Sequence, residues 1–532
     1  MLRSRWSVAA ARWQTQMADS VRSNFATQFA TTLSLRNERL FLAMLVLTLA
    51  PIWIGRYLPL VDIPQHAAQV AALREIWHGN ESLTQLFEIN WFTPYLFGYL
   101  LLYAVSSVMP ITIASKLVVS LAVVAIPLST GQLLRAAGAD ERWKWLAIPA
   151  SFSYAFYWGF LSYIVAAPLA LLFLARTVRF MAAPTVRNAI GIAVFSLLLF
   201  FCHVIVLGLA SLVALGYVAG VSYRDPRALV LRSLPYATPL PLIAIWLVIT
   251  YRTTPIVQSD PIVFPTLVGR LVQLLLQPAG QDGSSLLVAL LITAAVVALP
   301  PLAGAKFSRR PERWLPLALA MLVFMVAPHY VLSTAYFYQR LGLFLVPLWL
   351  MAWDAPSGPA RRLDWAAMLI VLIWACTTTG RFATFARETE SFKQAMASVE
   401  PGRRVASMVF DARSPFFTLP VYLHFPVWYQ ATQRGVVDFN FADFFSQMVR
   451  YKADAGPRMT DFLGWYPTEF EWQTHGGARY DYFMVKSSSD ISERIFKDKR
   501  GSVELVTHSG WWWLYRNLER APAATAASPA AN

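Results

Sequence analysis

The sequence has 532 residues, of which 57% are hydrophobic and only 14% are charged, and its formal net charge is +15. Soluble globular proteins average about 25% charged residues, so this composition excludes a soluble enzyme as well as collagen-like, disordered and disulfide-rich chains. The basic residues gather at the edges of apolar segments. That pattern is typical of cytoplasmic anchoring to anionic lipids and not of a nucleic-acid-binding surface.

Apolar runs of membrane-spanning length, which is about 20 residues, dominate the chain up to residue 380. We count eleven, near residues 39–55, 92–109, 112–134, 145–158, 160–181, 188–217, 229–251, 284–304, 313–334, 340–354 and 363–380. The sequence therefore predicts an α-helical polytopic membrane protein with about 11 transmembrane helices, which form a transmembrane module over residues 39–380.

The charges between these runs predict the side of the membrane that each loop occupies. Residues 1–38 carry five arginines and lack a signal-peptide cleavage site, so we expect a cytoplasmic N-terminal tail. The loop 56–91 is rich in carboxylates and is expected on the outer, periplasmic face. Arginine-rich loops at 218–232 and 306–313 are expected inside, which leaves everything after about residue 381 outside.

Two basic loops do not fit this arrangement. Residues 135–144 and 176–187 would lie outside if all eleven runs crossed the membrane. In an alternative arrangement, 92–109 is re-entrant and the overlong run 188–217 is split near His203, so that both basic loops fall inside. The two arrangements agree from residue 218 onward, and both remain open from the sequence.

Residues 381–520 have shorter apolar runs and more charge, and they predict a small periplasmic α/β domain. We expect helices over 382–398, 418–433 and 490–499, strands over 405–410, 436–441 and 480–485, and a hairpin pairing 503–507 with 511–515. The tail 521–532 is rich in Ala and Pro and is expected to be disordered.

The first outer loop contains the most informative stretch, Val61-Asp-Ile-Pro-Gln-His66, and residues 65–78 predict an amphipathic helix along the surface. Asp62 admits two interpretations. It could be the N-cap of this helix, with Gln65 completing a capping box, or a general base that takes a proton from an acceptor group. In the second case His66 would hydrogen-bond a phosphate or orient the carboxylate.

One acidic loop after the first span, a hydrophobic multi-span body and a terminal outer α/β domain together resemble the GT-C superfamily of integral membrane glycosyltransferases. The stretches that carry the resemblance are Val61–His66, Tyr157-Trp-Gly-Phe-Leu-Ser-Tyr163, Tyr338-Gln-Arg340, Tyr480-Asp-Tyr-Phe483 and Gly510-Trp-Trp-Trp-Leu-Tyr515. They look nearer to bacterial members that use polyprenyl-phosphate sugars than to any single named enzyme.

The resemblance implies inverting transfer of a sugar from a polyprenyl-phosphate or pyrophosphate carrier, with Asp62 as the essential base. Some members of the superfamily bind a divalent metal through an Asp-x-Asp or similar cluster. Here Asp62 is the only acid in its motif, so we favour a metal-free mechanism without a cofactor, in which cationic side chains stabilise the leaving phosphate.

A lipid phosphate in a membrane cleft needs a cation, and Arg340 is the strongest candidate because it opens the tenth span on the outer side. The alternative is an interface arginine that snorkels beside an aromatic belt. His329 and Tyr330 face the same side of the membrane and are expected to line the cleft. Together with His66 and Arg340 they form the predicted substrate-binding set.

Two further features have structural and functional interpretations. His203 lies inside an apolar run and is expected to be a hydrogen-bonded structural histidine, although an ionisable group at such depth is also a functional candidate. Residues 262–278 predict an interfacial helix with Arg270 on its polar face, which could act as a lid over the entrance for the lipid carrier.

The sequence therefore predicts a glycosyltransferase of the bacterial inner membrane that acts on a glycan, lipid or protein acceptor at the periplasmic face. Two other classes remain open. A transporter or flippase would be expected to show matching broken helices in paired halves, and the sequence shows no such correspondence. A non-catalytic scaffold of envelope polysaccharide assembly would need Asp62 only as a helix cap.

Overall fold

The computed structural model describes residues 38–253, 262–279, 286–331, 334–355, 361–455 and 465–520. It divides into two compact units, Met1–Ala50 and Pro51–Asn532. In the first unit residues 38–47 are helical. The tails predicted at 1–38 and 521–532 lie outside the described residues, apart from Glu38. The paragraphs below concern the second unit.

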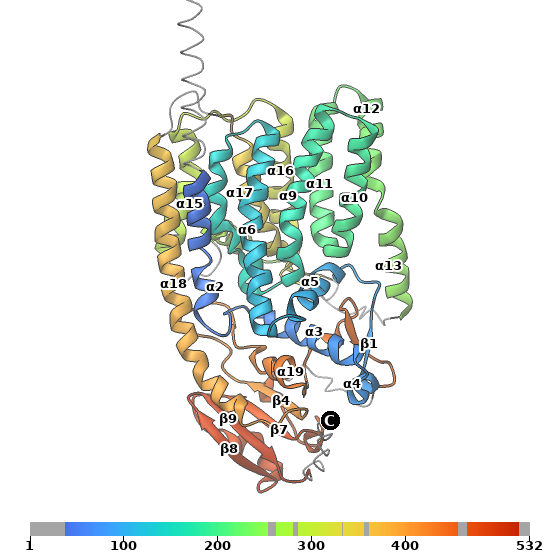
Figure 1. Cartoon of the computed structure of the whole chain (residues 1–532), viewed down its shortest axis with the longest axis vertical. Helices are drawn as coiled ribbons and strands as arrows, with labels where there is room; N and C mark the ends of the chain where they lie inside the picture. The colour runs from blue at the N-terminus through green and yellow to red at the C-terminus, as the bar shows by residue number, and fades with distance from the viewer. Residues whose placement is uncertain are drawn as a thin grey trace, which may run out of the picture. The chain divides into compact units, whose positions relative to one another are not determined.

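Helices make up most of the second unit (Figure 1). They are α2 (Ala50–Ile54, at the boundary of the units), α3 (Ile63–Trp77), α4 (Glu81–Leu86), α5 (Leu96–Ser106), α6 (Ile111–Ala137), α7 (Ala147–Ser151), α8 (Tyr154–Trp158), α9 (Leu161–Ala182), α10 (Val186–Cys202), α11 (Val204–Ser222), α12 (Pro226–Ser233), α13 (Leu240–Thr253), α14 (Leu267–Leu276), α15 (Leu286–Leu302), α16 (Pro311–Val326), α17 (Phe337–Met351), α18 (Arg361–Ala397), α19 (Trp428–Gln433) and α20 (Ser492–Ile495). Short 3-10 helices include η1 (Glu141–Leu146), η4 (Phe425–Val427), η5 (Phe441–Asp443) and η8 (Lys497–Lys499).

Four of the described helices, α6, α9, α11 and α18, are long and apolar enough to cross a membrane. The bent pair of α12 with η2 (Leu234–Ala237) and α13, which turns by 47°, makes up to five. The helices α5, α10, α14, α15 and α17 are apolar but shorter. The predicted count of about eleven spans is therefore not reproduced by helix length and composition, although the chain is a multi-pass membrane protein.

Two of the predicted spans are interrupted. Residues 145–158 form η1, α7 and α8 instead of one helix, and the left-handed Gly159 (φ +82°) ends the last of them. The run 188–217 breaks at His203, whose backbone is extended (φ −172°, ψ 114°), into α10 and α11, which lie side by side in Figure 1. This break is the one that the alternative arrangement requires. In that arrangement 92–109 is re-entrant, and α5, at 11 residues or roughly 16 Å, is too short to cross the hydrocarbon core.

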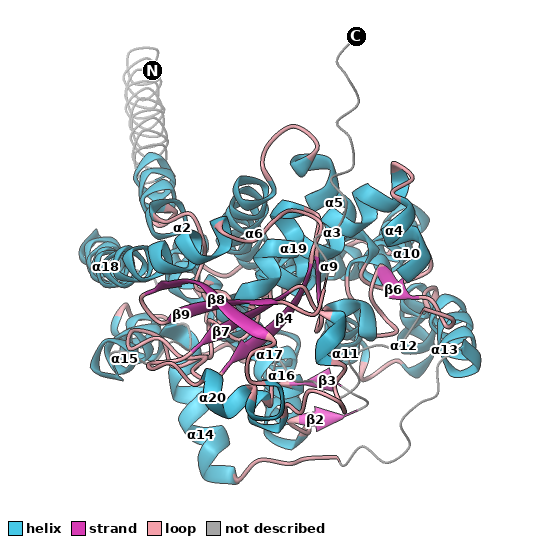
Figure 2. Ribbon diagram, turned by 90° about the horizontal axis from the view of Figure 1, so that it is seen from below, coloured by secondary structure: helices cyan, strands magenta, loops and turns pink. Residues whose placement is uncertain are grey.

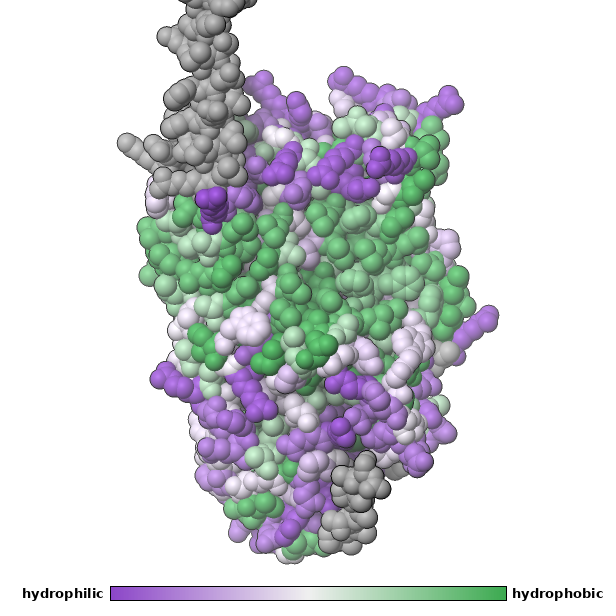
Figure 3. Space-filling model, in the orientation of Figure 1, coloured by the Kyte–Doolittle hydropathy of each residue, from purple (hydrophilic) through white to green (hydrophobic). Residues whose placement is uncertain are grey.

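Apolar side chains form a continuous band over the helices on the face shown in Figure 3, and hydrophilic residues gather beyond both edges of the band. Such a band is expected where lipid surrounds the helices. On α14 the exposed side chains are all apolar, namely Leu267, Val268, Leu271, Val272 and Leu275. The arginine of this helix does not lie on an exposed polar face as predicted, because Arg270 is buried and donates to the carbonyls of Phe324 (2.7 Å) and Ala327 (2.6 Å).

A five-stranded mixed sheet follows α18 in the chain (Figure 2), in the order β5 (Val436–Val437), β4 (Arg404–Val409), β7 (Tyr482–Lys486), β9 (Trp512–Asn517), β8 (Val503–Ser509). Strand β4 pairs in parallel with β5 and β7, and β9 pairs antiparallel with β7 and β8. Central strands buried on both faces read as apolar runs. Accordingly, the predicted strands at 405–410 and 480–485 and the final hairpin are confirmed.

Elements predicted between these strands are shorter than expected. Of the helix predicted over 418–433, only η4 and α19 form, since Pro420 and Pro426 lack the N–H that a helix interior requires. The strand predicted over 436–441 ends at Val437, and the side chain of Asn440 then accepts from the N–H of Ala442 to begin η5. The helix predicted over 490–499 is divided into α20 and η8.

Helix α3 lies between the helical bundle and α19 (Figure 1), and the view in Figure 2 also places α3 beside α19. Two small sheets accompany these helices: β1 (Phe87–Ile89) pairs with β6 (Val449–Tyr451), and β2 (Tyr330–Val331) pairs with β3 (Thr334–Ala335). Residues 63–73 of α3 are buried, with the exception of the half-buried Ala71. Helix α3 is therefore not the amphipathic surface helix that the sequence predicted.

The packing of α16 on α17 gives a test of the fold. Arg313 in the first turn of α16 is buried, and its guanidinium donates to the carbonyls of Met351 (2.9 and 3.0 Å) and Trp353 at the end of α17. We expect Arg313→Met to lower the free energy of unfolding by at least about 2 kcal/mol, because buried carbonyls lose their donors. The midpoint of thermal denaturation in detergent measures the effect. Arg309→Met, at an exposed position, should leave the midpoint unchanged.

Candidate active site

Asp62 lies in the connection between α2 and α3 and is only 5% exposed. The backbone around it is fixed to the end of α8, since Val61 N–H donates to the Tyr157 carbonyl (3.2 Å) and Asp62 N–H to the Trp158 carbonyl (2.9 Å). Asp62 stands at the N-cap position of α3, but its side chain makes no capping hydrogen bond. The capping-box interpretation of Asp62 is therefore wrong, and the carboxylate is available for other contacts.

Gly159 explains why the chain can approach Asp62 so closely. Its backbone is left-handed (φ +82°), and a Cβ built on it would lie 3.0 Å from the backbone nitrogens of both Asp62 and Ile63. Any larger residue would be strained by its conformation and would also collide with the loop. The stretch Tyr157–Tyr163 noted in the sequence is thus the wall against which Asp62 is held.

Three groups act on the Asp62 carboxylate from three different segments. The Trp158 side chain hydrogen-bonds it, Arg340 interacts with it electrostatically, and the His424 Nε2 atom lies 3.5 Å from its Oδ1. Burial raises the pKa of Asp62 well above its usual value, while the Arg340 charge and the Trp158 hydrogen bond oppose that rise. A raised pKa makes the ionised carboxylate a stronger base.

His66 makes its side-chain hydrogen bond to α5 and not to Asp62. Its Nδ1 lies 2.9 Å from the Tyr99 hydroxyl, which in turn donates to the Gln447 Oε1. The His66 Nδ1 therefore carries the proton, and its Nε2 carries a lone pair. Burial, with a further contribution from Arg340, lowers the pKa of His66 to about 3. His66 is thus a neutral group able to accept a hydrogen bond, rather than a cation for a phosphate.

Arg340 lies in the first turn of α17 and is surrounded by aromatic rings. Its guanidinium stacks 3.6 Å from the centre of the Phe160 ring and donates to the Ala335 carbonyl (2.9 Å). The Tyr163 hydroxyl donates to the backbone carbonyl of Arg340 (2.7 Å). The Nε of Arg340 is buried and finds no hydrogen-bond partner within the described ranges. The half-buried Arg340 is thus held against Phe160, and its Nε remains free for a ligand.

His203 lies at the break between α10 and α11, edge-on to Tyr95 (ring centres 4.7 Å apart) and to Tyr163 (5.1 Å). Its ring is 2% exposed, and its Nδ1 has no partner in the part of the chain that the structure describes. The hydrogen bond expected of a structural histidine is therefore missing at this nitrogen. His203 and Arg340 also interact electrostatically, which indicates that both line the same buried region.

His329 reaches the site through Tyr336. Its Nδ1 lies 2.6 Å from the Gln339 Nε2, and its ring lies edge-on to Tyr336, which packs on Trp158 with ring centres 4.0 Å apart. Tyr336 itself has a positive φ of 58° as the N-cap of α17, a strained conformation for a non-glycine residue. Burial lowers the pKa of His329.

Tyr330 pairs with Ala335 across the two short strands β2 and β3, and its backbone bonds to Val263. The structure thus places Tyr330 in the small sheet that also contains Ala335, whose carbonyl accepts a hydrogen bond from Arg340. Histidine, cysteine, aspartate and glutamate form no group of three or more with metal-binding geometry among the described residues.

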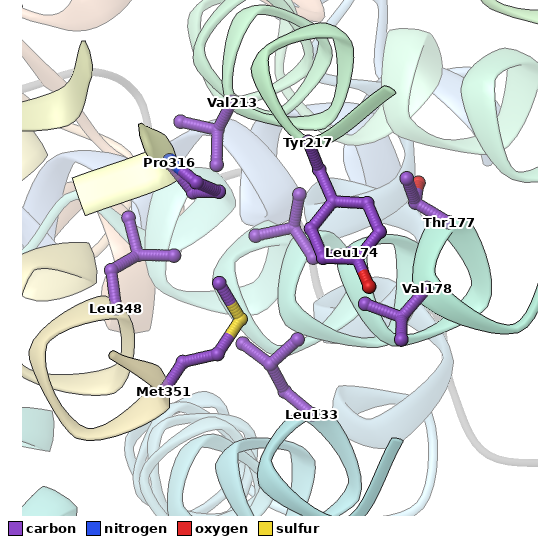
Figure 4. A pocket seen from close by; sticks show the side chains of 9 residues that line it. All are labelled: Leu133, Leu174, Thr177, Val178, Val213, Tyr217, Pro316, Leu348 and Met351. Atoms are coloured by element: carbon purple, nitrogen blue, oxygen red, sulfur yellow. The ribbon is translucent and has the colours of Figure 1, made fainter. Parts of the chain in front are cut away.

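A small apolar cavity lies elsewhere in the bundle (Figure 4). Its lining comes from α6, α9, α11, α16 and α17, namely Leu133, Leu174, Thr177, Val178, Val213, Tyr217, Pro316, Leu348 and Met351. Leu174 lies 13 residues along α9 from Leu161, which is roughly 20 Å at 1.5 Å per residue. This cavity has no carboxylate or cation in its lining and is too far along the bundle to belong to the Asp62 site.

Several residues of the site could not be identified from the sequence. His424 and Gln447 come from the segment after α18, more than 340 residues from their partners Gln65 and Tyr99. Neither stands in a motif, and no pattern in the first loop indicates that this segment reaches it. The motif around Asp62 identifies the carboxylate in the sequence. The residues that contact this carboxylate can be identified only from the tertiary structure.

Solved structures show what fold this arrangement belongs to. The structure of ArnT from Cupriavidus metallidurans bound to undecaprenyl phosphate is 10% identical, with a TM-score of 0.55, over 91% of this chain and 98% of ArnT. The apo structure of ArnT from the same organism is 13% identical over the same shares, with a TM-score of 0.51. The sequence matches no protein-family model, and no curated protein matches it. The chain therefore shares the fold of ArnT.

The close approach of Gly159 to the Asp62 backbone predicts a stability difference between two glycines. An alanine in the left-handed conformation costs about 1–2 kcal/mol. Gly159→Ala should lower the free energy of unfolding by more than this, because the new Cβ also displaces the loop around Asp62. Gly138 has a similar φ of +71° but nothing within 4 Å of its Cβ position, so Gly138→Ala isolates the conformational cost. Thermal denaturation midpoints that fall equally in both variants would contradict the contact.

Proposed function

We propose that this protein is a membrane glycosyltransferase that moves a sugar from a polyprenyl-phosphate carrier to an acceptor on the periplasmic face, with inversion at the anomeric carbon. The observation that carries the proposal is the buried carboxylate of Asp62, which interacts electrostatically with the Arg340 guanidinium, whose Nε is also buried. A base and a cation in one enclosed region are what displacement of a phosphate by a hydroxyl or amine requires. The undecaprenyl phosphate bound to ArnT, which shares this fold, supports a carrier of the same kind.

In the proposed reaction Asp62 takes the proton of the acceptor hydroxyl or amine as the acceptor atom bonds to the anomeric carbon. The bond from that carbon to the phosphate oxygen breaks on the opposite side, and its electron pair leaves with the carrier phosphate. Arg340 stabilises the charge that develops on this phosphate, because charge-assisted hydrogen bonds are strong in a site from which water is excluded. The proton ends on Asp62 and leaves to solvent when the product departs.

The neighbouring groups have roles that follow from their protonation. His66 offers a lone pair at Nε2 and is suited to accept a hydrogen bond from an acceptor hydroxyl. The unpaired Nε of Arg340 and Nδ1 of His203 are the atoms that a carrier phosphate would bind. His329 and Tyr336 lie just before the N-terminus of α17 and would position the carrier head group from that side. No residue of the described part is assigned to a metal.

Replacing the base gives the first test of the proposal. Asp62→Asn should reduce sugar transfer from radiolabelled polyprenyl-phosphate sugars in lipid nanodiscs by about 100-fold or more, because the amide cannot take the proton. Glu75→Gln, which removes a carboxylate further along α3, is the matched control and should keep wild-type rates. Equal rates for Asp62→Asn and wild type would overturn the enzyme proposal in favour of a transporter or a scaffold.

The cation can be tested without turnover. Polyprenyl phosphate without a sugar should raise the thermal denaturation midpoint of wild type, because a ligand that binds only the folded state stabilises it. Arg340→Lys should lose most of this increase, since lysine cannot offer two donors in a fork. Arg270→Lys is the control, because Arg270 is a buried arginine and its hydrogen bonds go to two backbone carbonyls. This variant should have a lower denaturation midpoint without ligand, but polyprenyl phosphate should still raise that midpoint as in wild type. A full increase in Arg340→Lys would exclude Arg340 as the phosphate ligand.

A further inference from the structure

His424 is a buried side chain for which the proposed reaction has no role so far. It precedes η4 in the segment after α18 and is 2% exposed. Its ring is enclosed by three aromatic rings, those of Phe439, Phe441 and Trp465, at centre distances of 5.4, 5.8 and 6.2 Å. Its Nε2 lies 3.5 Å from Oδ1 of Asp62. A residue some 360 positions away in the chain thus faces the carboxylate directly.

The side chain of Gln65 fixes the protonation of the His424 ring. The Gln65 Oε1 accepts the N–H of Phe441 (3.0 Å), and its Nε2 donates to the carbonyl of Phe439 (3.2 Å), so the orientation of the amide is set by the backbone. The same Nε2 lies 3.3 Å from Nδ1 of His424. An amide nitrogen can only donate, so Nδ1 carries the lone pair and Nε2 carries the proton.

We propose that His424 is a positioning residue for Asp62: its Nε2–H donates to the Asp62 carboxylate, and Gln65 holds the ring in the tautomer that makes this possible. The inference rests on the proposed function, since it concerns the base of that reaction. It also assigns a role to the segment after α18, which completes the active site instead of only covering it. The arrangement parallels a general one, in which a second group orients a buried catalytic side chain through one hydrogen bond.

The His424 ring must stay neutral for Nδ1 to accept the hydrogen bond from Gln65. Burial, with a contribution from His66, lowers the pKa of His424 to about 3, so the ring is uncharged throughout the range in which an enzyme is assayed. A hydrogen bond to the charged form of a carboxylate lowers the pKa of that carboxylate. Other titratable or charged groups that interact with Asp62 from the elements packed around it are Arg340 on α17, Tyr336 before α17, Tyr99 on α5 and Tyr154 on α8, while His66 on α3 interacts with His424.

The acid limb of the pH profile of kcat/KM is the decisive measurement, because it reports the pKa of the base in the free enzyme. His424→Phe fills the aromatic enclosure but removes the donor, so the acid limb should move upward by about one pH unit. His424→Gln keeps a donor near the position of Nε2, so its limb should return toward that of wild type. A merely structural role of His424 would change the plateau or the stability without moving the limb.

A second pair of variants keeps the test decisive if His424→Phe fails to fold. Gln65 and Gln69 each exchange two hydrogen bonds with the backbone of the segment after α18, at Phe439 and Phe441 and at Val449 respectively. Only Gln65 also contacts His424. Gln65→Leu should therefore shift the acid limb upward, by less than His424→Phe does, whereas Gln69→Leu should lower the denaturation midpoint and leave the limb in place.

The outcomes separate the inference from the proposed function. If wild type transfers sugar and Asp62→Asn does not, while His424→Phe and Gln65→Leu both keep the wild-type acid limb, the positioning role is overturned and the function stands. The same holds if Gln69→Leu shifts the limb as much as Gln65→Leu does. If Asp62→Asn retains wild-type activity, the proposed function fails and the inference fails with it.

Discussion

The burial of a single carboxylate is the constraint on which the rest of this structure depends. Asp62 is 5% exposed, and an ionised carboxylate removed from water is costly unless hydrogen bonds and opposite charge replace its hydration. The replacements come from separate parts of the chain: the Trp158 side chain at the end of α8, the Arg340 guanidinium on α17 and the His424 imidazole after α18. The fold therefore has to bring three distant segments to one point.

Helix α3 is the element that makes this convergence possible. It begins one residue after Asp62, and its buried glutamines at 65 and 69 bond to the backbone of the segment after α18 through paired donors and acceptors. Such pairs satisfy the buried backbone groups at Phe439, Phe441 and Val449. On its other side α3 reaches α5 through the hydrogen bond between His66 and Tyr99. The position of Asp62 is thus fixed from the bundle and from the sheet region together.

The sequence predicted the parts of this arrangement that depend on local patterns. Long apolar runs predicted the membrane fold, short apolar segments predicted β4, β7 and the final hairpin, and the motif around Asp62 predicted its importance. Three kinds of feature escaped. The helix break at His203 cannot be located from the sequence because apolar residues continue through it. The burial of α3 is missed because a helical pattern does not show what covers the helix. His424 carries no local signal at all. Its contact with Asp62 exists only in three dimensions.

Buried polar atoms without a hydrogen-bond partner occur at several places in the described part of the chain, and three of them belong to Arg340 and to residues linked to it. Buried polar groups in folded proteins are nearly always satisfied, because each unpaired one costs free energy. Within the described part of the chain, Nε of Arg340, Nδ1 of His203 and Oε1 of Gln339 are nevertheless buried without a hydrogen-bond partner. Arg340 and His203 interact electrostatically with each other, and Gln339 precedes Arg340 in α17. The unpaired Nε of Arg340 and Nδ1 of His203 would be completed by a polar ligand of the kind that the proposed function requires.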